Sequence, residues 1–415
     1  MTAWANTTFA SLRTPNYRRF FAGQAVSLVG TWMQTVAQAW LVLELTGSGT
    51  ALGLVAAAQF LPILLLAPYG GVLADRLDKR TILIATQCAL GAMALTLGIL
   101  TVTGAVRLWM VVVLALALGV ATAIDNPARQ AFAQEMVGAG GLRNAVSLNS
   151  VLVNTARAVG PAVAGVLIVT VGTGPCFLIN AASYVAVVVA LVGMDVGALR
   201  PTPREDRAPG QVRQGLRYVA HTPDLLVPLM MLAVVGTLAY EFQVVLPLLA
   251  TGPFGGGAGT YSLLTSAMGA GAIVGGLVVA GRGRTGLGAL TVASAVFGLA
   301  ILAAAAAPSV GVALVALAVV GATSVTFLAV GNTTLQLTAE PRFRGRVMAL
   351  WAVAFLGSTP LGAPIVGAVS EHLSPRGGLV IGGLACLTAA GLGALAIARR
   401  GPRGTGRAGL SAARP

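Results

Sequence analysis

The sequence predicts an all-α membrane protein with twelve transmembrane helices arranged as two six-helix bundles. The first observation is composition, because 56% of the 415 residues are hydrophobic and only 9% are charged. The mean hydropathy of +0.87 lies well above that of a soluble globule. The second is a series of uncharged runs, such as 50–74, each with the roughly 20 residues that a helix needs to cross a hydrocarbon core of about 30 Å. The third is that the charges gather in short segments between these runs.

Six apolar runs occupy the first half of the chain, each ending at charges or at Gly and Pro residues. They lie at about 20–45, 50–74, 82–103, 108–128, 146–170 and 176–196. Six more follow at about 225–250, 259–281, 286–307, 309–331, 347–370 and 378–398. A polar, proline-containing segment separates the two sets, and a short amphipathic helix is expected within it near 212–219. The predicted domains are an N-terminal bundle (1–196), a cytoplasmic linker (197–222), a C-terminal bundle (223–398) and a basic cytoplasmic tail (399–415).

The distribution of positive charge predicts the topology. The chain carries 26 Lys and Arg residues against 12 Asp and Glu, a formal charge of +14. Short loops rich in Lys and Arg stay in the cytoplasm, and placing both termini there leaves only Arg107 and Arg376 in external loops. Because the cations are spread over loops and not gathered on one soluble face, we expect no nucleic-acid partner. The great excess of Arg over a single Lys suggests a bacterial genome, so we expect a multi-pass protein of the bacterial cytoplasmic membrane.

The segment GGVLADRLDKR (70–80) is a tight charged hairpin between the second and third predicted helices. Asp75 at the end of the second helix can accept hydrogen bonds from the free amides of a neighbouring helix N-terminus, an interaction of about 0.3–1 kcal/mol when exposed. A contact of this kind that forms only when the cytoplasmic side is closed would bias an equilibrium between two states. The alternative is that the hairpin only anchors the topology. We predict a gating loop made of Gly71, Asp75, Arg76 and Arg80.

This hairpin, together with two six-helix halves, resembles the major facilitator superfamily and its loop signature of a Gly, an Asp, an Arg and a terminal basic pair. The matching residues are Gly71, Leu73, Asp75, Arg76 and Arg80, whereas Asp78 stands where the family usually has a second glycine. The segment IDNPARQAFAQEMV resembles the branch of bacterial enterobactin exporters and drug-efflux permeases, which implies exchange of substrate for protons. The fifth helix partly resembles the antiporter motif through Gly160, Pro161 and Gly165. The fourth-helix arginine of many proton-coupled relatives is absent from 108–124.

A stripe of polar residues runs along the first predicted helix at steps of three and four. Its members fall on one face, which is more polar than packing requires, so we expect it to line a wet cavity. The alternative is hydrogen bonding between helices, which membrane helices use freely. Trp32 lies nearby and suits a large, partly apolar ligand. The predicted cavity residues are Gln24, Ser27, Thr31, Trp32, Gln34, Gln38, Asn154 and Tyr240.

Arg157 lies near the middle of the fifth helix, where a lone arginine costs about 2.5–3.5 kcal/mol on insertion scales. It therefore needs a partner in protein or water. The acidic residue at comparable depth is Glu241 in the seventh helix, and Asp125 lies nearer a helix end. We predict proton coupling through Glu241 and Arg157, with Asp125 as the second candidate for the acid; a fixed structural ion pair is the alternative.

The sequence contains no pattern typical of an enzyme, a metal site or a nucleotide cofactor, because it lacks ligand-spaced His or Cys residues and a phosphate-binding loop. This leaves a secondary transporter, and the family resemblance implies a proton-coupled antiporter that exports a hydrophobic or amphipathic small molecule such as a drug or a siderophore-like metabolite; we expect it to be monomeric in the lipid bilayer. The alternatives are a non-transporting membrane receptor or partner protein on the same scaffold, and a transporter of lipid-like cargo.

Overall fold

A computed structural model describes residues 9–200, 211–282 and 285–400 of the chain. Within these residues all regular structure is helical, and twelve segments are long and apolar enough to cross a membrane. The predicted all-α membrane protein with twelve spans is therefore confirmed. The linker and the tail expected at 197–222 and 399–415 fall partly on 201–210 and 401–415, which lie outside the described residues.

The N-terminal bundle contains the first six spans. After a short 3-10 turn, η1 (Ala10–Arg13), come α2 (Pro15–Thr46), α3 (Gly49–Arg76), α4 (Lys79–Val102), α5 (Leu108–Val171) and α6 (Thr173–Val192). The long α5 holds two spans, Leu108–Gly138 and Gly140–Val171. They reverse direction at Gly138, whose φ of +70° is a left-handed conformation that favours glycine. The fourth span thus extends ten residues beyond its predicted end at 128, so Arg129 belongs to a helix and not to a loop.

The C-terminal bundle contains the other six spans, two of which are interrupted. A 3-10 turn, η2 (Val196–Ala198), and the short linker helix α7 (Gln211–Ala220) precede it. Its helices are α8 (Pro223–Leu238), α9 (Phe242–Thr251), α10 (Ala258–Arg282), α11 (Leu287–Ala305), α12 (Val310–Thr338), α13 (Arg344–Leu356), α14 (Thr359–His372) and α15 (Pro375–Arg400). The pair α8 and α9 forms the seventh span, and α13 and α14 form the eleventh. Each pair leaves a break in the backbone partway through the span.

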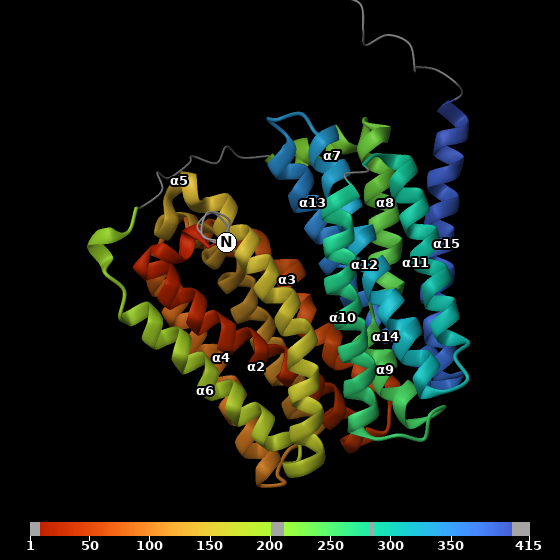
Figure 1. Cartoon of the computed structure of the whole chain (residues 1–415), viewed down its shortest axis with the longest axis horizontal. Helices are drawn as coiled ribbons and strands as arrows, with labels where there is room; N and C mark the ends of the chain where they lie inside the picture. Colours follow the sequence, from red (N-terminus) through yellow and green to blue (C-terminus); the bar gives the residue numbers. More distant parts are fainter. Residues whose placement is uncertain (1–8, 201–210, 283–284, 401–415) are drawn as a thin grey trace, which may run out of the picture.

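The two bundles lie side by side, with α2 to α6 on the left of Figure 1 and α8 to α15 on the right. They meet through α3 against α14 and through α5 against α10. Close approach of the helices makes glycine necessary at these contacts, since a Cβ on Gly53 would lie 2.4 Å from the carbonyl oxygen of Ala363. Likewise, a Cβ on Gly269 would lie 2.8 Å from the Arg157 carbonyl oxygen. Gly53 lies near the start of α3, at the end of the spans remote from α7, and Gly269 lies near the middle of α10.

The buried apolar side chains also connect the two bundles at the end of the spans remote from the linker. The largest cluster contains residues of both bundles, for example Trp40 and Leu52 with Tyr261 and Val366. A second cluster, around Tyr17, lies at the opposite end of the spans and draws on the N-terminal bundle, together with Met194 and Leu199 just after α6. The bundles therefore share a core at the end remote from the linker, which continues within the C-terminal bundle as far as Val219 of α7, whereas the N-terminal bundle has a separate core at the linker end.

A polar contact also joins the bundles at the end remote from the linker. The carboxylate of Glu371 in α14 accepts hydrogen bonds from the Ser48 hydroxyl, at 2.7 Å, and from the Thr50 backbone N–H, at 2.8 Å. Thr50 belongs to the first turn of α3, whose amides have no partner within the helix. A carboxylate of one bundle thus caps a helix of the other.

Candidate functional site

The seventh span is broken at mid-depth, and Tyr240 and Glu241 lie at the break. The Tyr240 hydroxyl donates to the backbone carbonyl of Ser324, 2.9 Å away. Glu241 precedes the first residue of α9 and is only 2% exposed. Neither of its carboxylate oxygens has a hydrogen-bond partner within 3.5 Å in the described residues, although the Thr359 hydroxyl of α14 lies close enough to interact with the carboxylate. A small cavity beside it is lined by α11 and α15, so Glu241 lies inside the C-terminal bundle.

Arg157 lies near the middle of the fifth span and has neither a hydrogen bond nor an ion pair in the described part of the chain. Its guanidinium carbon stands 4.8 Å from the centroid of the Trp32 ring, a cation–π geometry. Its Nε is buried without an acceptor. The predicted partnership with Glu241 is therefore not formed in this conformation, and it stays a prediction for another state.

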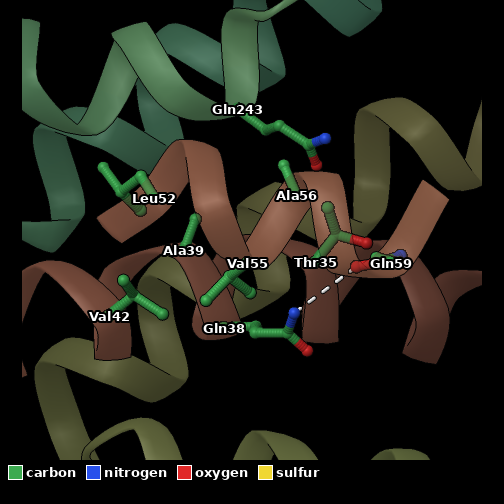
Figure 2. A pocket seen from close by; sticks show the side chains of 9 residues that line it. All are labelled: Thr35, Gln38, Ala39, Val42, Leu52, Val55, Ala56, Gln59 and Gln243. Atoms are coloured by element: carbon green, nitrogen blue, oxygen red, sulfur yellow. Dashed lines mark hydrogen bonds between the residues drawn. The ribbon is translucent and has the colours of Figure 1, made fainter. Parts of the chain in front are cut away.

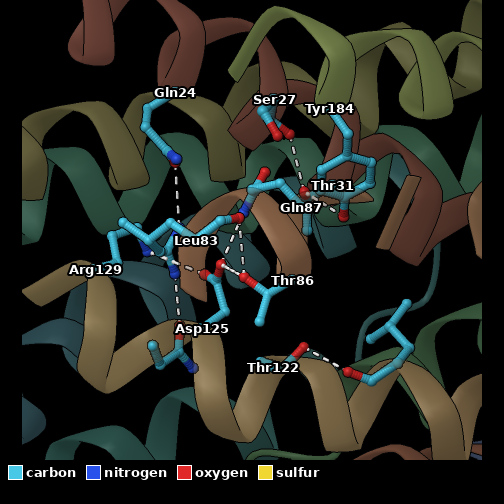
Figure 3. Close-up of polar contacts among 12 residues, drawn as sticks. Gln24, Ser27, Thr31, Leu83, Thr86, Gln87, Thr122, Asp125, Arg129 and Tyr184 are labelled. Atoms are coloured by element: carbon cyan, nitrogen blue, oxygen red, sulfur yellow. Dashed lines mark hydrogen bonds and ion pairs between the residues drawn. The ribbon is translucent and has the colours of Figure 1, made fainter. Parts of the chain in front are cut away.

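Asp125 is the centre of a polar network that connects three helices (Figure 3). It is 3% exposed, and its Oδ1 accepts from the Thr86 hydroxyl at 2.8 Å and from the Gln87 amide at 2.9 Å. Its Oδ2 lies 3.5 Å from Nε of Arg129, one turn further along α5. Arg129 also donates to Gln24 at 3.2 Å, which links α2, α4 and α5. A buried acid with a basic partner thus lies inside the N-terminal bundle.

Sequence analysis missed Arg129 as a site residue. The apolar run of the fourth predicted helix ends near 128, so Arg129 was expected to lie beyond that helix. In the structure α5 continues to the reversal at Gly138. The available signal was the spacing, since Asp125 and Arg129 are four residues apart and such residues are neighbours on a helix. The fourth span therefore does carry an arginine, beyond the 108–124 window.

The polar stripe of α2 divides between two environments. Gln34 accepts a hydrogen bond from the Asn180 amide of α6 at 2.6 Å. The Thr31 hydroxyl donates to the Ser27 carbonyl and lies 3.4 Å from the Tyr184 hydroxyl of α6. These residues face the interior of the N-terminal bundle, as the alternative of interhelical bonding expects. Gln38, further along α2, faces a pocket.

This pocket lies between α2 and α3 on one side and α9 of the other bundle on the opposite side (Figure 2). The Gln38 amide donates to Gln59 of α3, 3.4 Å away, and Gln243 comes from α9. The other lining residues are Thr35, Ala39, Val42, Leu52, Val55 and Ala56. Three amide side chains on an otherwise largely apolar wall provide both hydrogen-bond donors and acceptors at the boundary of the bundles.

We predict different outcomes for two leucine substitutions in this stripe. Gln38→Leu removes an amide from the pocket and should change which compounds are exported, with little loss of folded protein. Gln34→Leu leaves the Asn180 amide without its acceptor, so it should lower stability by about 1 kcal/mol. Export profiles across several compounds and thermal unfolding in detergent measure the two effects. An equal effect of Gln38→Leu on every compound would mean that this glutamine is structural.

The charged hairpin packs its cations within the N-terminal bundle. Arg80 donates to the backbone carbonyls of Leu191 and Val192 at 2.7 and 3.0 Å, and so caps the C-terminus of α6. Lys79 forms a 2.7 Å ion pair with Glu135. Gly71 and Arg76 lie in the last two turns of α3, and the side chain of Asp75 lies outside the described part of the structure. The gating role of this loop stays a prediction.

The antiporter-like residues lie at close helix approaches. A Cβ on Gly160 would stand 2.5 Å from the Trp32 Cβ, and one on Gly165 would stand 2.5 Å from the Ser262 Cβ of α10. Pro161 is buried within α5. Asn154, six residues before Gly160, donates to the Ser150 carbonyl of its own helix. The motif thus packs the fifth span against the first span and against the other bundle.

The described residues contain no group of three or more His, Cys, Asp or Glu side chains placed to hold a metal ion. The described residues form two helical bundles, with a buried acid in each, an arginine at mid-depth in the fifth span and a pocket at the boundary of the two bundles. The model of the transmembrane secretion effector family matches residues 6–401, which is nearly the whole chain.

The chain belongs to this family of major facilitator transporters. The family resemblance predicted from the charged hairpin is thereby confirmed. Among the curated relatives, the staphyloferrin A transporter of Staphylococcus aureus is 30% identical over 41% of this chain and 44% of that protein. The aligned region therefore spans less than half the length of this relative.

Two further relatives align over most of their length. Macrolide efflux protein A of Streptococcus pyogenes is 25% identical over 82% of this chain and 86% of that protein. The multidrug efflux pump Tap of Mycolicibacterium fortuitum is 26% identical over the same shares. Among solved structures, a bacterial homologue of the human lysosomal transporter Spinster has a TM-score of 0.73 at 16% identity, and covers 93% of this chain and 97% of that chain. This last likeness shows the fold.

Proposed function

We propose that the protein is a proton-coupled antiporter of the bacterial cytoplasmic membrane that exports amphipathic small molecules by alternating access. The observation that carries this proposal is that the two bundles share a core and close glycine contacts at the end remote from the linker. A transporter of this plan holds substrate near the midplane between its repeats and opens to one side at a time. The close contacts at one end are what a closed gate requires.

The distribution of Lys and Arg indicates which side of the membrane the closed end faces. Loops rich in Lys and Arg stay in the cytoplasm, so the end of the spans that carries the linker helix α7 is the inner side in this proposal. The contacts of Gly53 with Ala363 and of Glu371 with Ser48 then form the closed outer gate. In the opposite state, Asp75 would cap a helix of the C-terminal bundle and hold the inner side closed.

Proton coupling needs an acid whose charge state depends on the conformation. A proton drives a transition only if its binding free energy differs between the two states. Glu241 is the first candidate because its carboxylate is buried at a helix break, with the Thr359 hydroxyl nearby but no hydrogen-bond partner within 3.5 Å in the described residues. Movement at the break would change which groups meet this acid. Asp125 is the second candidate, held by Thr86, Gln87 and Arg129.

The cargo class comes from the relatives. These relatives are named for transport of staphyloferrin A and for efflux of macrolides and of multiple drugs. The aromatic and amide side chains near the boundary of the bundles suit compounds with both apolar and polar parts. We therefore expect an amphipathic small molecule, and export as the direction.

The test is flux in vesicles that contain the purified full chain and a labelled macrolide antibiotic. An imposed proton gradient should drive movement of the antibiotic against its own gradient, and an ionophore that removes the proton gradient should stop it. Binding of the antibiotic without such flux would favour a receptor on this scaffold. Movement of a fluorescent phospholipid, with none of the antibiotic, would favour lipid-like cargo.

A further inference from the structure

A set of aromatic side chains connects Arg157 with the C-terminal bundle at mid-depth. Tyr240 lies within electrostatic range of Arg157. Its ring centroid is 4.8 Å from that of Phe355 in an edge-to-face arrangement, and Phe355 is stacked against Trp351 at 5.7 Å. With Trp32 under the guanidinium, these residues form what we call the arginine–aromatic site: Trp32, Arg157, Tyr240, Trp351 and Phe355.

All five side chains of the arginine–aromatic site are half-buried and not fully enclosed. A partly exposed arginine near the middle of a span cannot face lipid without a large cost. The packing of the fifth span gives the reason, because Gly160 meets Trp32 of α2, and the backbone of Arg157 and Ala158 meets Gly269 of α10 in the other bundle. The open part of the guanidinium therefore faces the boundary between the bundles, where a transporter holds its cargo.

The site offers hydrogen-bond donors that have no acceptors. Nε of Arg157 is buried without a partner, and the indole N–H of Trp351 is buried without a partner as well. Tyr240 donates its hydroxyl proton to Ser324, so it is a neutral neighbour. In the described residues no carboxylate lies within 4.0 Å of Arg157. Cation–π contact with Trp32 offsets part of the cost of the charge but satisfies none of the N–H groups.

We infer that the counter-ion of Arg157 is the cargo itself, so that the arginine–aromatic site binds the anionic group of an amphipathic molecule with an aromatic or apolar body. Arginine presents a planar fork of donors that matches a carboxylate in two-point contact. The rings of Trp32, Tyr240 and Phe355 provide faces and edges for the apolar body. This inference rests on the proposed export function, since it names the chemical class of the molecule exported.

The experiment compares two probes that differ only in charge, dansyl-phenylalanine and its primary amide. Their binding to the full chain in detergent is measured by dansyl fluorescence. The native protein should bind the carboxylate about tenfold or more tightly than the amide, as expected for hydrogen bonds to a charged group. Arg157→Gln should reduce this ratio to near one through loss of carboxylate affinity alone. Arg157→Lys should keep part of the preference, because it keeps the charge without the fork.

Equal binding of the two probes by the native protein would overturn the inference, and so would a preference that survives in Arg157→Gln. If Arg157→Gln does not fold, the binding of the two probes to the native protein and to Arg157→Lys still tests the inference. Phosphatidylglycerol added to the micelles should not displace the carboxylate probe; displacement that depends on Arg157 would assign the site to a lipid headgroup and overturn the small-molecule assignment. Gradient-driven flux of a macrolide, together with equal binding of the two dansyl probes, would support the proposed function and reject this inference. Preferential binding of the carboxylate probe without gradient-driven flux of any compound would support an anion site at Arg157 and reject the proposed export function.

Discussion

Glu241→Gln is expected to abolish export driven by a proton gradient while leaving substrate binding intact. The substitution keeps the size of the side chain and removes its ability to exchange a proton. Glu241 has no hydrogen-bond partner within 3.5 Å in the described residues, and the nearby Thr359 hydroxyl can donate to the side-chain oxygen of a glutamine as well as to a carboxylate, so glutamine suits the same surroundings. A protein without a titrating group at the coupling position can still exchange substrate down its own gradient. Purified protein in vesicles with an imposed pH gradient measures both activities.

The matched variant for this experiment is Asp125→Asn in the N-terminal bundle. Asp125 accepts from Thr86 and Gln87 and pairs with Arg129, so its substitution leaves a half-buried arginine without its carboxylate. We expect this variant to lose stability, as loss of one partner of a buried pair does, and to keep gradient-driven flux in the protein that remains folded. Full gradient-driven transport by Glu241→Gln, with loss in Asp125→Asn, would move the coupling role to Asp125.

Gly53→Val is expected to prevent closure of the outer gate. A Cβ at this position would lie 2.4 Å from the Ala363 carbonyl oxygen, a backbone atom that cannot rotate away. Overpacking of this kind costs about 1–3 kcal/mol or more, which corresponds to about a 5- to 150-fold shift in the equilibrium between the two states. Transport should fall because the protein rarely reaches the inward-facing state. The structure has room for the change only when α3 and α14 have separated.

The measurement is labelling of a cysteine in place of Ala56, which lines the pocket between the bundles, in a variant without the three native cysteines. A membrane-impermeant maleimide added outside should react faster when Gly53→Val is present. Gly391→Val serves as the matched control, because a Cβ on this glycine of α15 meets open space. Glu371→Gln weakens the cap on α3 and should raise labelling to a lesser degree. Unchanged labelling in Gly53→Val would show that the contact with Ala363 is not part of the gate.

Sequence patterns located several site residues without placing their side chains. The spacing of Gln24, Ser27, Thr31, Gln34 and Gln38 put them on one face of a helix, which the structure confirms in α2. Which neighbour that face meets depends on the rotation of α2 against α5 and α6. The structure turns Gln34 toward Asn180, whereas Gln38 meets the pocket. Arg129 was missed because hydropathy marks where an apolar run ends, and the helix itself continues into polar sequence.

The sequence alone determined the membrane class, the twelve spans and the charged hairpin, because hydropathy and charge order are properties of consecutive residues. It also marked Arg157, Glu241 and Asp125 as costly charges within or near spans. Only the tertiary structure decided their surroundings: Asp125 meets Arg129, Glu241 lies inside the C-terminal bundle, and Arg157 meets Trp32 instead of an acid. The physical reason is that the partner of a buried charge is set by the packing of helices far apart in the chain, which no local pattern records.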